Sequence, residues 1–396
     1  MTPGGPPRGS TWRRSAPLGL SAAALALVWL VVTNHGPFAA TDVNDLYVYS
    51  VAKELLRDGQ VPYRDFGFEY PPLALVPIGL AGGSAIAMSL LMLACAIGTQ
   101  VAAWALGGPV AGWSMVALPV LAGALVRTHI DLLPAALALG GLALVCRARP
   151  TAGLALLGLG TMAKLWPVVV AACALAWLHA RGRPIARPAL AFAAVVAVLG
   201  IPFAVLGGFP SDMVRFHVDR PVQIESTPAA VLSLVGGSHV TGAPVLPDPY
   251  KSNGLDGGAA DAVQLIFALA LAAALAASVV LARRDLLRAA FVATLAFVAL
   301  GKVLSPQYLC WLLPFAAVLF ARGDRLAPAF VAAAALLTQA WFPRHYFDVV
   351  DQDAWAVAAV AVRDLLLLAA LASTARAAAR SPSPASPRRR PSPAPR

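Results

Sequence analysis

Two groups of acidic residues stand beside apolar segments in this chain of 396 residues. Asp42 and Asp45 precede the stretch LYVYSVAKELLR, and Glu69 and Tyr70 precede two consecutive prolines. A carboxylate that is held near a substrate hydroxyl group can accept its proton. These positions therefore favour binding or acid–base chemistry.

Four further segments carry cations and amides at the ends of apolar runs: VRTHIDLLPAAL, AKLWP, RFHVDRPVQIES and GKVLSPQYLCWLLP. Their polar residues are Arg127, His129, Asp131, Lys164, His217, Arg220, Gln223, Glu225, Lys302, Gln307 and Tyr308. Each segment alone is ambiguous, because polar residues at helix ends often serve only as anchors. Together they predict a site for an anionic phosphate beside a proton-accepting base.

Asp42 and Asp45 also have a purely structural interpretation. The pattern predicts an amphipathic helix over about 44–57, capped by Asn44 or Asp42 and ended by Gly59. Tyr49 belongs to its apolar stripe. From the residues alone, capping and a favourable helix dipole explain the two aspartates at least as well as catalysis does.

The composition is that of a membrane protein, with 59% hydrophobic and 12% charged residues. Soluble domains carry about a quarter charged residues. The net charge of +11 resides in short loops and tails, so a nucleic-acid partner is excluded along with a water-soluble enzyme and a disordered chain. The four cysteines form no CxxC pair, which argues against a disulfide framework or structural zinc.

Twelve apolar stretches are candidate membrane helices. They cover about 17–33, 84–106, 110–126, 131–146, 151–163, 166–179, 189–207, 262–282, 288–303, 307–321, 327–342 and 355–375. The first could be a signal peptide, but it lacks a convincing cleavage site and is interpreted as an uncleaved span. The stretches 151–163 and 166–179 are too short to cross, so they predict a hairpin from the cytoplasmic side with Lys164 at its tip.

The distribution of charge predicts the topology and the domains. Lys and Arg concentrate on the side of both termini, which the positive-inside rule makes cytoplasmic. We expect a cytoplasmic segment over 1–16, a membrane domain over 17–375, and large outer loops over 34–83 and 208–261. The Pro- and Arg-rich tail, 376–396, is expected to be disordered and cytoplasmic; it could attract anionic lipid or simply anchor the topology.

Several of these segments resemble glycosyltransferase family 87, which includes polyprenol-phosphate-mannose-dependent α-mannosyltransferases of bacterial envelopes. The matching pieces are NDLYVYSVAKELLRDGQVPY with EYPP, AKLWP, HVDRPVQIES and KVLSPQYLCWLLP, in this order over about residues 42–315. The resemblance implies an all-α polytopic membrane protein with a GT-C-type fold. Such a fold has about 12 transmembrane or short re-entrant helices and a large first outer loop.

The resemblance also implies roles for single residues. Asp45 matches the family's catalytic acid, with Asp42 as the alternative, and would act as the general base of an inverting transfer. The donor would be a sugar on polyprenyl phosphate, because nucleotide sugars are cytosolic and the site faces outward. Lys164, His217, Arg220 and Lys302 are then assigned to the phosphate, Gln307 and Tyr308 to the sugar, and Tyr49, Glu69, Tyr70, Gln223 and Glu225 to acceptor or loop contacts.

The segment VRTHIDLLPAAL departs from the family pattern, which puts Arg127, His129 and Asp131 in doubt as site residues. The outer loops contain no DxD-type pair of acids, so catalysis is expected to need no metal and no cofactor beyond the lipid-linked sugar. The lipid-linked donor, membrane lipid and an envelope lipid or glycan acceptor are the expected partners, on the outer face of the plasma membrane. The oligomeric state is not indicated.

Two other functions stay open from the sequence. The same fold could transfer arabinose or glucose instead of mannose. A lipid or solute transporter could bind and release a phosphate without chemistry, although the chain shows no internal repeat and few ionisable residues in mid-span.

Overall fold

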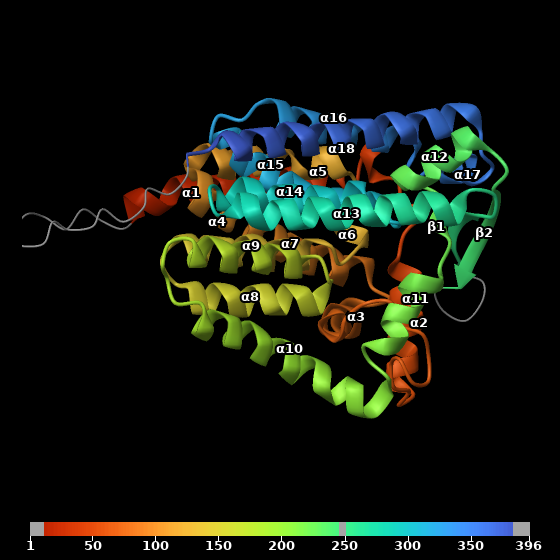
Figure 1. The fold of residues 1–396 in the computed structure, drawn as a ribbon, viewed down its shortest axis with the longest axis horizontal. Coiled ribbons are helices and arrows are strands. Elements are labelled where there is room, and N and C mark those ends of the chain that lie inside the picture. Colours follow the sequence, from red (N-terminus) through yellow and green to blue (C-terminus); the bar gives the residue numbers. More distant parts are fainter. Residues whose placement is uncertain (1–11, 245–250, 383–396) are drawn as a thin grey trace, which may run out of the picture.

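The structure is a computed structural model that describes residues 12–244 and 251–382. Most of the described chain is helical, and the long helices run along a common axis (Figure 1). Four stretches are long and apolar enough to cross a membrane: Ala85–Ala122, Ala186–Gly207, Ala260–Ala282 and Ala354–Arg380. The predicted all-α polytopic class is confirmed.

The apolar helices follow the predicted segments closely. They are α1 (Trp12–Val32), α4 (Ala85–Ser114), α5 (Leu118–Ala122), α6 (Leu125–Thr128), α7 (Leu132–Cys146), α8 (Pro150–Ala163), α9 (Pro167–His179), α10 (Ala186–Gly207), α13 (Ala260–Ala282), α14 (Leu286–Ala299), α15 (Leu309–Ala321), α16 (Leu326–Trp341) and α18 (Ala354–Arg380). The short α17 (Tyr346–Val350) connects the last two. Nearly all of α14 and α15 is buried, so these two helices form the centre of the core.

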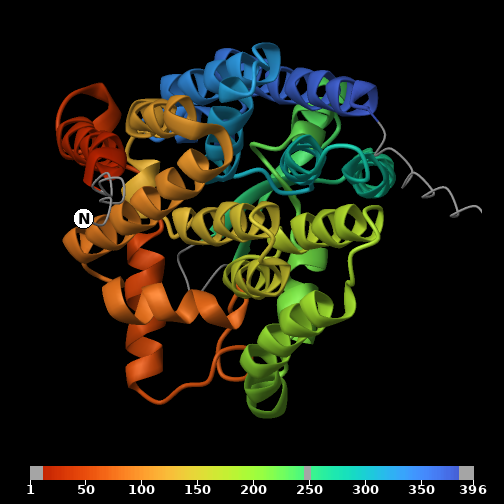
Figure 2. The ribbon, with the colours of Figure 1, turned by 90° about the vertical axis from the view of Figure 1, so that its left-hand side faces the viewer.

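The helices on either side of this centre are seen best along the long axis. Figure 2 shows α16 and α18 (blue) on one side and α8 to α10 (yellow to green) on the other. Helix α14 packs against both α18 and α9 and so joins the two sides. Residues far apart in sequence are thereby brought to the same end of the bundle.

The stretches predicted over 84–106 and 110–126 form a helical hairpin. Gly108 has a backbone conformation outside the helical region (φ 71°, ψ −162°), and Pro109 follows it. Beyond this break, Gly112 lies against the ring of Trp104, and the amide of Gln100 donates to the Gly112 carbonyl oxygen (3.0 Å). Residue 112 can contact residues 100 and 104 only if the chain reverses direction at Gly108.

The predicted short hairpin is also present. Helices α8 and α9 meet at Lys164, and α7 packs tightly against α8. At the other end of α9, the Arg181 guanidinium donates to the Arg283 carbonyl oxygen (3.3 Å). The termini of α9 and α13 therefore lie together, as the charge pattern requires.

In the first large loop, α2 (Leu46–Arg57) matches the predicted amphipathic helix, and Gly59 follows it with φ 79°. The Asn44 side-chain oxygen accepts a hydrogen bond from the Leu46 amide (2.9 Å), whereas Asp45 makes no capping hydrogen bond. Asp45 thus occupies the N-cap position without a side-chain cap, and the favourable helix dipole is not contradicted. Helix α3 (Leu75–Ala81), preceded by a 3₁₀ turn over Pro72–Ala74, is too short to span a membrane.

The second large loop contains a small sheet that the sequence does not predict. Helices α11 (Ser211–Asp219) and α12 (Thr227–Val235) alternate with strands β1 (Val222–Gln223), β2 (His239–Pro244) and β3 (Lys251–Asp256). The sheet is antiparallel in the order β1, β3, β2. Strand β1 has two residues, too few for the alternation by which a strand is recognised.

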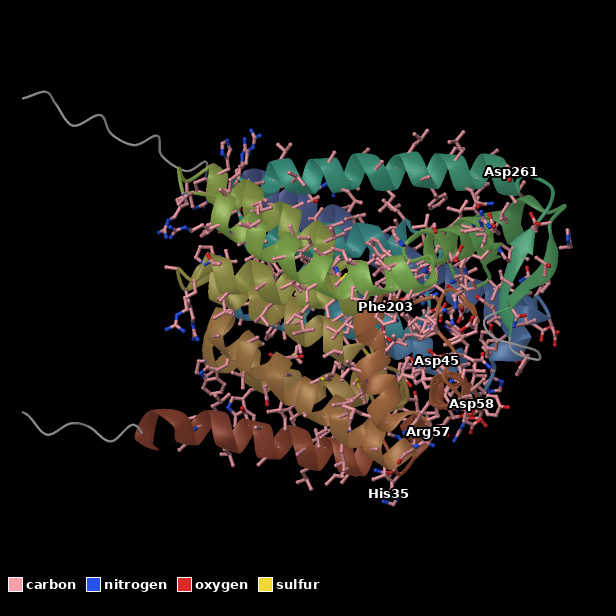
Figure 3. All side chains as sticks on the ribbon, turned by 90° about the horizontal axis from the view of Figure 1, so that it is seen from below. His35, Asp45, Arg57, Asp58, Phe203 and Asp261 are labelled. Atoms are coloured by element: carbon pink, nitrogen blue, oxygen red, sulfur yellow. The ribbon has the colours of Figure 1, made fainter. Side chains whose placement is uncertain are left out.

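The first and last long helices extend beyond the predicted apolar stretches. Helix α1 begins at Trp12 rather than near 17, and α18 continues to Arg380, so 376–380 are helical instead of disordered. The rest of the predicted tail from 383 lies outside the described residues. Figure 3 shows Asp45, Arg57, Asp58 and Asp261 toward one end of the molecule, and α1 begins at the opposite end.

The contact between α7 and α8 gives a first prediction. A β-carbon on Gly141 would lie 2.8 Å from the Gly153 carbonyl oxygen, whereas one on Gly140 would meet only Leu156, at 3.7 Å. We expect Gly141→Ala to lower the free energy of unfolding by about 1–3 kcal/mol through overpacking. Gly140→Ala is the matched control and should not destabilise the protein. Thermal unfolding of both variants in detergent tests this, and equal melting temperatures would contradict the packing.

Candidate active site

A cavity of about 870 Å³ lies at the end of the bundle that carries α2, α11 and the small sheet. Its wall comes from both large loops, from the tip of the α8–α9 hairpin and from the segment between α14 and α15. The predicted site residues that line it are Asp42, Asp45, Glu69, Tyr70, Lys164, His217, Arg220, Gln223, Glu225, Lys302, Gln307 and Tyr308. Five separate segments thus meet at one cavity, while the roles given to the residues stay predictions.

Asp45 occupies a partly buried position in this wall, with 27% of its side chain exposed. Its Oδ2 accepts hydrogen bonds from the hydroxyl groups of Tyr49 (3.2 Å) and Tyr70 (3.5 Å). Burial, together with the negative charge of Glu69, raises the pKa of Asp45 to about 6. Tyr49 does not line the cavity, but its hydroxyl group contacts Asp45, which does.

His129, which sequence reasoning left in doubt, lies beside this carboxylate. Its Nε2 is 3.6 Å from Asp45 Oδ2, and its Nδ1 is 2.8 Å from the Thr128 hydroxyl. Burial lowers the pKa of His129 to about 4, so the imidazole is neutral at pH 7. A neutral histidine leaves Asp45 without a cationic partner there, which helps keep it a usable base.

Lys164 enters the cavity wall from the tip of the hairpin. Its Nζ pairs with Asp131 Oδ1 (2.7 Å), and the same oxygen accepts a hydrogen bond from Trp311 Nε1 (2.7 Å). The ammonium group also faces the rings of Tyr70, Tyr308 and Trp311 at 5.1–5.3 Å. Asp131 does not line the cavity, so it is the buried counter-ion that fixes the lysine.

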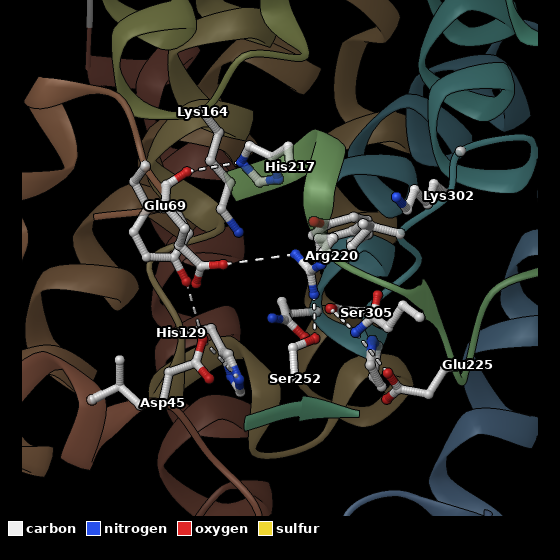
Figure 4. A pocket seen from close by; sticks show the side chains of 18 of the residues that line it. Asp45, Glu69, His129, Lys164, His217, Arg220, Glu225, Ser252, Lys302 and Ser305 are labelled. Atoms are coloured by element: carbon white, nitrogen blue, oxygen red, sulfur yellow. Dashed lines mark hydrogen bonds and ion pairs between the residues drawn. The ribbon is translucent and has the colours of Figure 1, made fainter. Parts of the chain in front are cut away.

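Two more cations face the cavity from the second loop and the α14–α15 connection. Arg220 lies between the Glu69 carboxylate (3.8 Å) and the Ser252 hydroxyl group, to which it donates a hydrogen bond. Lys302 donates to the Val218 carbonyl oxygen (2.8 Å). His217 is fixed by the Glu69 carbonyl oxygen (3.0 Å). Figure 4 shows Arg220 in the middle of this group.

The far side of the cavity is a wall of uncharged and acidic side chains. The Gln223 amide donates to Glu225 (2.7 Å) and to the Ser305 hydroxyl (2.8 Å), and Asn253 donates to the Tyr346 hydroxyl (3.1 Å). Burial raises the pKa of Glu225 to about 8, so its carboxyl group is largely protonated at pH 7.

Sequence reasoning missed Ser252, Ser305, Asn253 and Tyr346. Ser252 and Asn253 reach the site through the pairing of β3 with β1, which has no local signature. Ser305 does have one, because it adjoins the polar residues of the SPQY segment.

A further ion pair lies next to Glu225. Arg363 and Asp364 form a fully buried pair of sequence neighbours (2.6 Å), and Arg363 also donates to the Glu225 carbonyl oxygen. Within 12–244 and 251–382, no group of three or more His, Cys, Asp or Glu residues is placed to hold a metal ion.

The buried ion pair predicts an asymmetric loss of stability. Lys164→Ala leaves the Asp131 carboxylate, which is 1% exposed, without its cation and should cost about 3–5 kcal/mol. The control Arg64→Ala removes a cation from the exposed Arg64–Asp65 pair and should have no measurable effect. The double variant Lys164→Met/Asp131→Leu should recover much of the loss. Chemical denaturation in detergent tests the series, and equal midpoints for Lys164→Ala and Arg64→Ala would refute it.

Comparison with known proteins gives one family match. Residues 254–361, from β3 into α18, match the family model described as Mannosyltransferase (PIG-M). No curated protein matches the chain. The crystal structure of ArnT from Cupriavidus metallidurans in the apo state is similar at a TM-score of 0.45 and 15% identity, covering 92% of this chain and 78% of that chain. The matched family segment includes Lys302, Gln307 and Tyr308.

Proposed function

We propose that this chain is a GT-C-type membrane glycosyltransferase that moves mannose from a polyprenyl-phosphate carrier to a hydroxyl group of an envelope lipid or glycan. The observation that carries the proposal is a partly exposed carboxylate of raised pKa, Asp45, in one cavity with Lys164, Arg220 and Lys302. The match of residues 254–361 to a mannosyltransferase family supports the choice of sugar. The outer face of the plasma membrane is the proposed place of reaction.

In this mechanism, Asp45 takes the proton from the acceptor hydroxyl group while the oxygen of that hydroxyl group attacks the anomeric carbon. The bond from that carbon to the phosphate oxygen breaks, and its electron pair leaves with the phosphate. Arg220, Lys302 and Lys164 stabilise the negative charge that develops on the leaving group. One displacement step inverts the anomeric configuration.

The apolar part of the cavity wall supports a lipid carrier rather than a water-soluble donor. Val218 of α11, Leu271 of α13, Phe297 of α14 and Val303 lie on it with Lys302. An isoprenoid chain would contact these side chains while its phosphate stays at the cations.

Removal of the base is the first test. We expect Asp45→Asn to lower the rate of mannose transfer from polyprenyl-phosphate mannose by about 100-fold or more, because the amide keeps the shape and cannot take the proton. The comparison variant is Asp42→Asn, whose side chain is exposed and which should keep most of the activity. Membranes with matched expression are assayed with labelled donor.

Three outcomes separate the competing explanations. Equal rates for wild type and Asp45→Asn would rule out Asp45 as the base, and loss of transfer in Asp42→Asn alone would move the role there. If wild type does not transfer mannose, glucose or arabinose to any acceptor, the transferase proposal fails, and transport without chemistry is favoured.

The pKa of Asp45 predicts the pH dependence. A general base works when deprotonated, so kcat/KM should fall as the pH drops below about 6. Glu69 raises this pKa through its charge, so Glu69→Gln should move the acid limb to lower pH. A pH profile of transfer by both proteins tests this. An acid limb that stays in place or moves to higher pH would contradict the effect of the Glu69 charge on the pKa of Asp45.

A further inference from the structure

The side chain of Gln223 has an unused polar atom in the cavity wall. Its Nε2 donates to Glu225 Oε2 (2.7 Å) and to the Ser305 hydroxyl (2.8 Å). Its Oε1 is buried and has no hydrogen-bond partner within the described parts of the chain. Buried polar atoms are nearly always paired in folded proteins, so this oxygen is a candidate contact for a bound molecule.

The backbone around Gln223 is held by several separate elements. The backbone N–H of Gln223 donates to the Lys302 carbonyl oxygen (3.1 Å), and the backbone carbonyl oxygen of Gln223 accepts from Ser226. The next residue, Ile224, donates to Asn253 of β3 (3.1 Å). These backbone contacts, together with the two hydrogen bonds of Nε2, hold the side-chain Oε1 in place before any ligand arrives, which lowers the entropic cost of binding.

The chemistry of the free atom selects its ligand. A leaving phosphate offers only acceptor oxygens once ionised, and an isoprenoid chain offers no hydrogen-bonding group. A sugar hydroxyl group both donates and accepts. A sugar hydroxyl group can therefore donate to Oε1 in the arrangement of the structure. If the side-chain amide is rotated by about 180°, Glu225 and Ser305 donate to the amide oxygen, and the hydroxyl group accepts from the amide nitrogen.

The position of the free atom points to the transferred sugar rather than to the acceptor. Figure 4 shows Asp45 and Glu225 at opposite sides of the cavity, with Arg220 between them. The acceptor hydroxyl group must reach Asp45, and the phosphate must reach the cations. The sugar ring lies between these two partners in the reaction, so one edge of it is free to face the wall formed by Gln223.

We propose that Gln223 binds a ring hydroxyl group of the transferred sugar and so helps to select the sugar, with Glu225 and Ser305 as positioning residues that orient its amide. This proposal rests on the proposed function, because it assumes that a sugar is transferred. It adds a residue that determines donor specificity at a stated atom. Neither Glu225 nor Ser305 needs to touch the sugar for this role.

The test compares polyprenyl-phosphate mannose with analogues that lack one ring hydroxyl group each, at positions 2, 3, 4 and 6. Wild type should discriminate against one analogue by about 100-fold or more in kcat/KM, because that donor leaves the buried amide unpaired. Gln223→Met keeps the volume and removes the polar atoms, so its discrimination at that position should fall to about 10-fold or less. The rate with that analogue itself should change little.

Two further variants guard against an effect of misfolding. Gln100 is the matched control, because its Oε1 is also buried without a partner among the described residues, while its side-chain amide donates to the carbonyl oxygens of Ser21 and Gly112, which do not line the cavity. Gln100→Met should keep the wild-type discrimination. Ser305→Ala removes one of the two contacts that orient the Gln223 amide and should weaken discrimination at the same hydroxyl group without abolishing transfer.

The outcomes distinguish failure of this inference from failure of the proposed function. Transfer by wild type with equal rates for all analogues would overturn the inference alone. So would a uniform loss for every donor in Gln223→Met, or unchanged discrimination in both Gln223→Met and Ser305→Ala. Absence of any sugar transfer by wild type would instead reject the proposed function.

Discussion

The ion pair between Lys164 and Asp131 is the interaction on which the arrangement of the cavity depends. It joins the tip of the α8–α9 hairpin to the start of α7, and the Trp311 indole adds α15 to the same oxygen. An ammonium ion in an apolar surrounding is unfavourable without a partner, so the carboxylate is required wherever this lysine is buried. The tip of the hairpin is held at this carboxylate.

The region around Asp45 follows the opposite principle. It has hydroxyl groups and a neutral imidazole as neighbours, and the nearby Glu69 carboxylate disfavours its charge further. The protein therefore places one carboxylate against a cation and another beside hydroxyl groups and a neutral imidazole at the same end of the bundle. This separation gives one acidic residue a structural role and leaves the other free to exchange a proton.

Much of this arrangement could be predicted from the sequence, since membrane helices are recognisable from apolar length and the site residues are the charged exceptions beside them. Asp45, Lys164, Arg220 and Lys302 were singled out in this way, and all four line the cavity. The role of Asp131 could not be found, because its partner is 33 residues away and nothing local marks the pair. Ser252 and Asn253 were missed for the same reason, since a two-residue strand and its distant partner carry no periodic pattern.

The contact between Arg220 and Glu69 joins the two large loops across the cavity. Each cation at the site already has an internal partner: a carboxylate for Lys164 and Arg220, and a backbone carbonyl oxygen for Lys302. A phosphate would have to compete with these partners, and they would be ready to take its place when it departs. In the proposed reaction, this internal competition would weaken the binding of the spent carrier, so the groups that help the bond to break would also favour release of the phosphate before the next turnover.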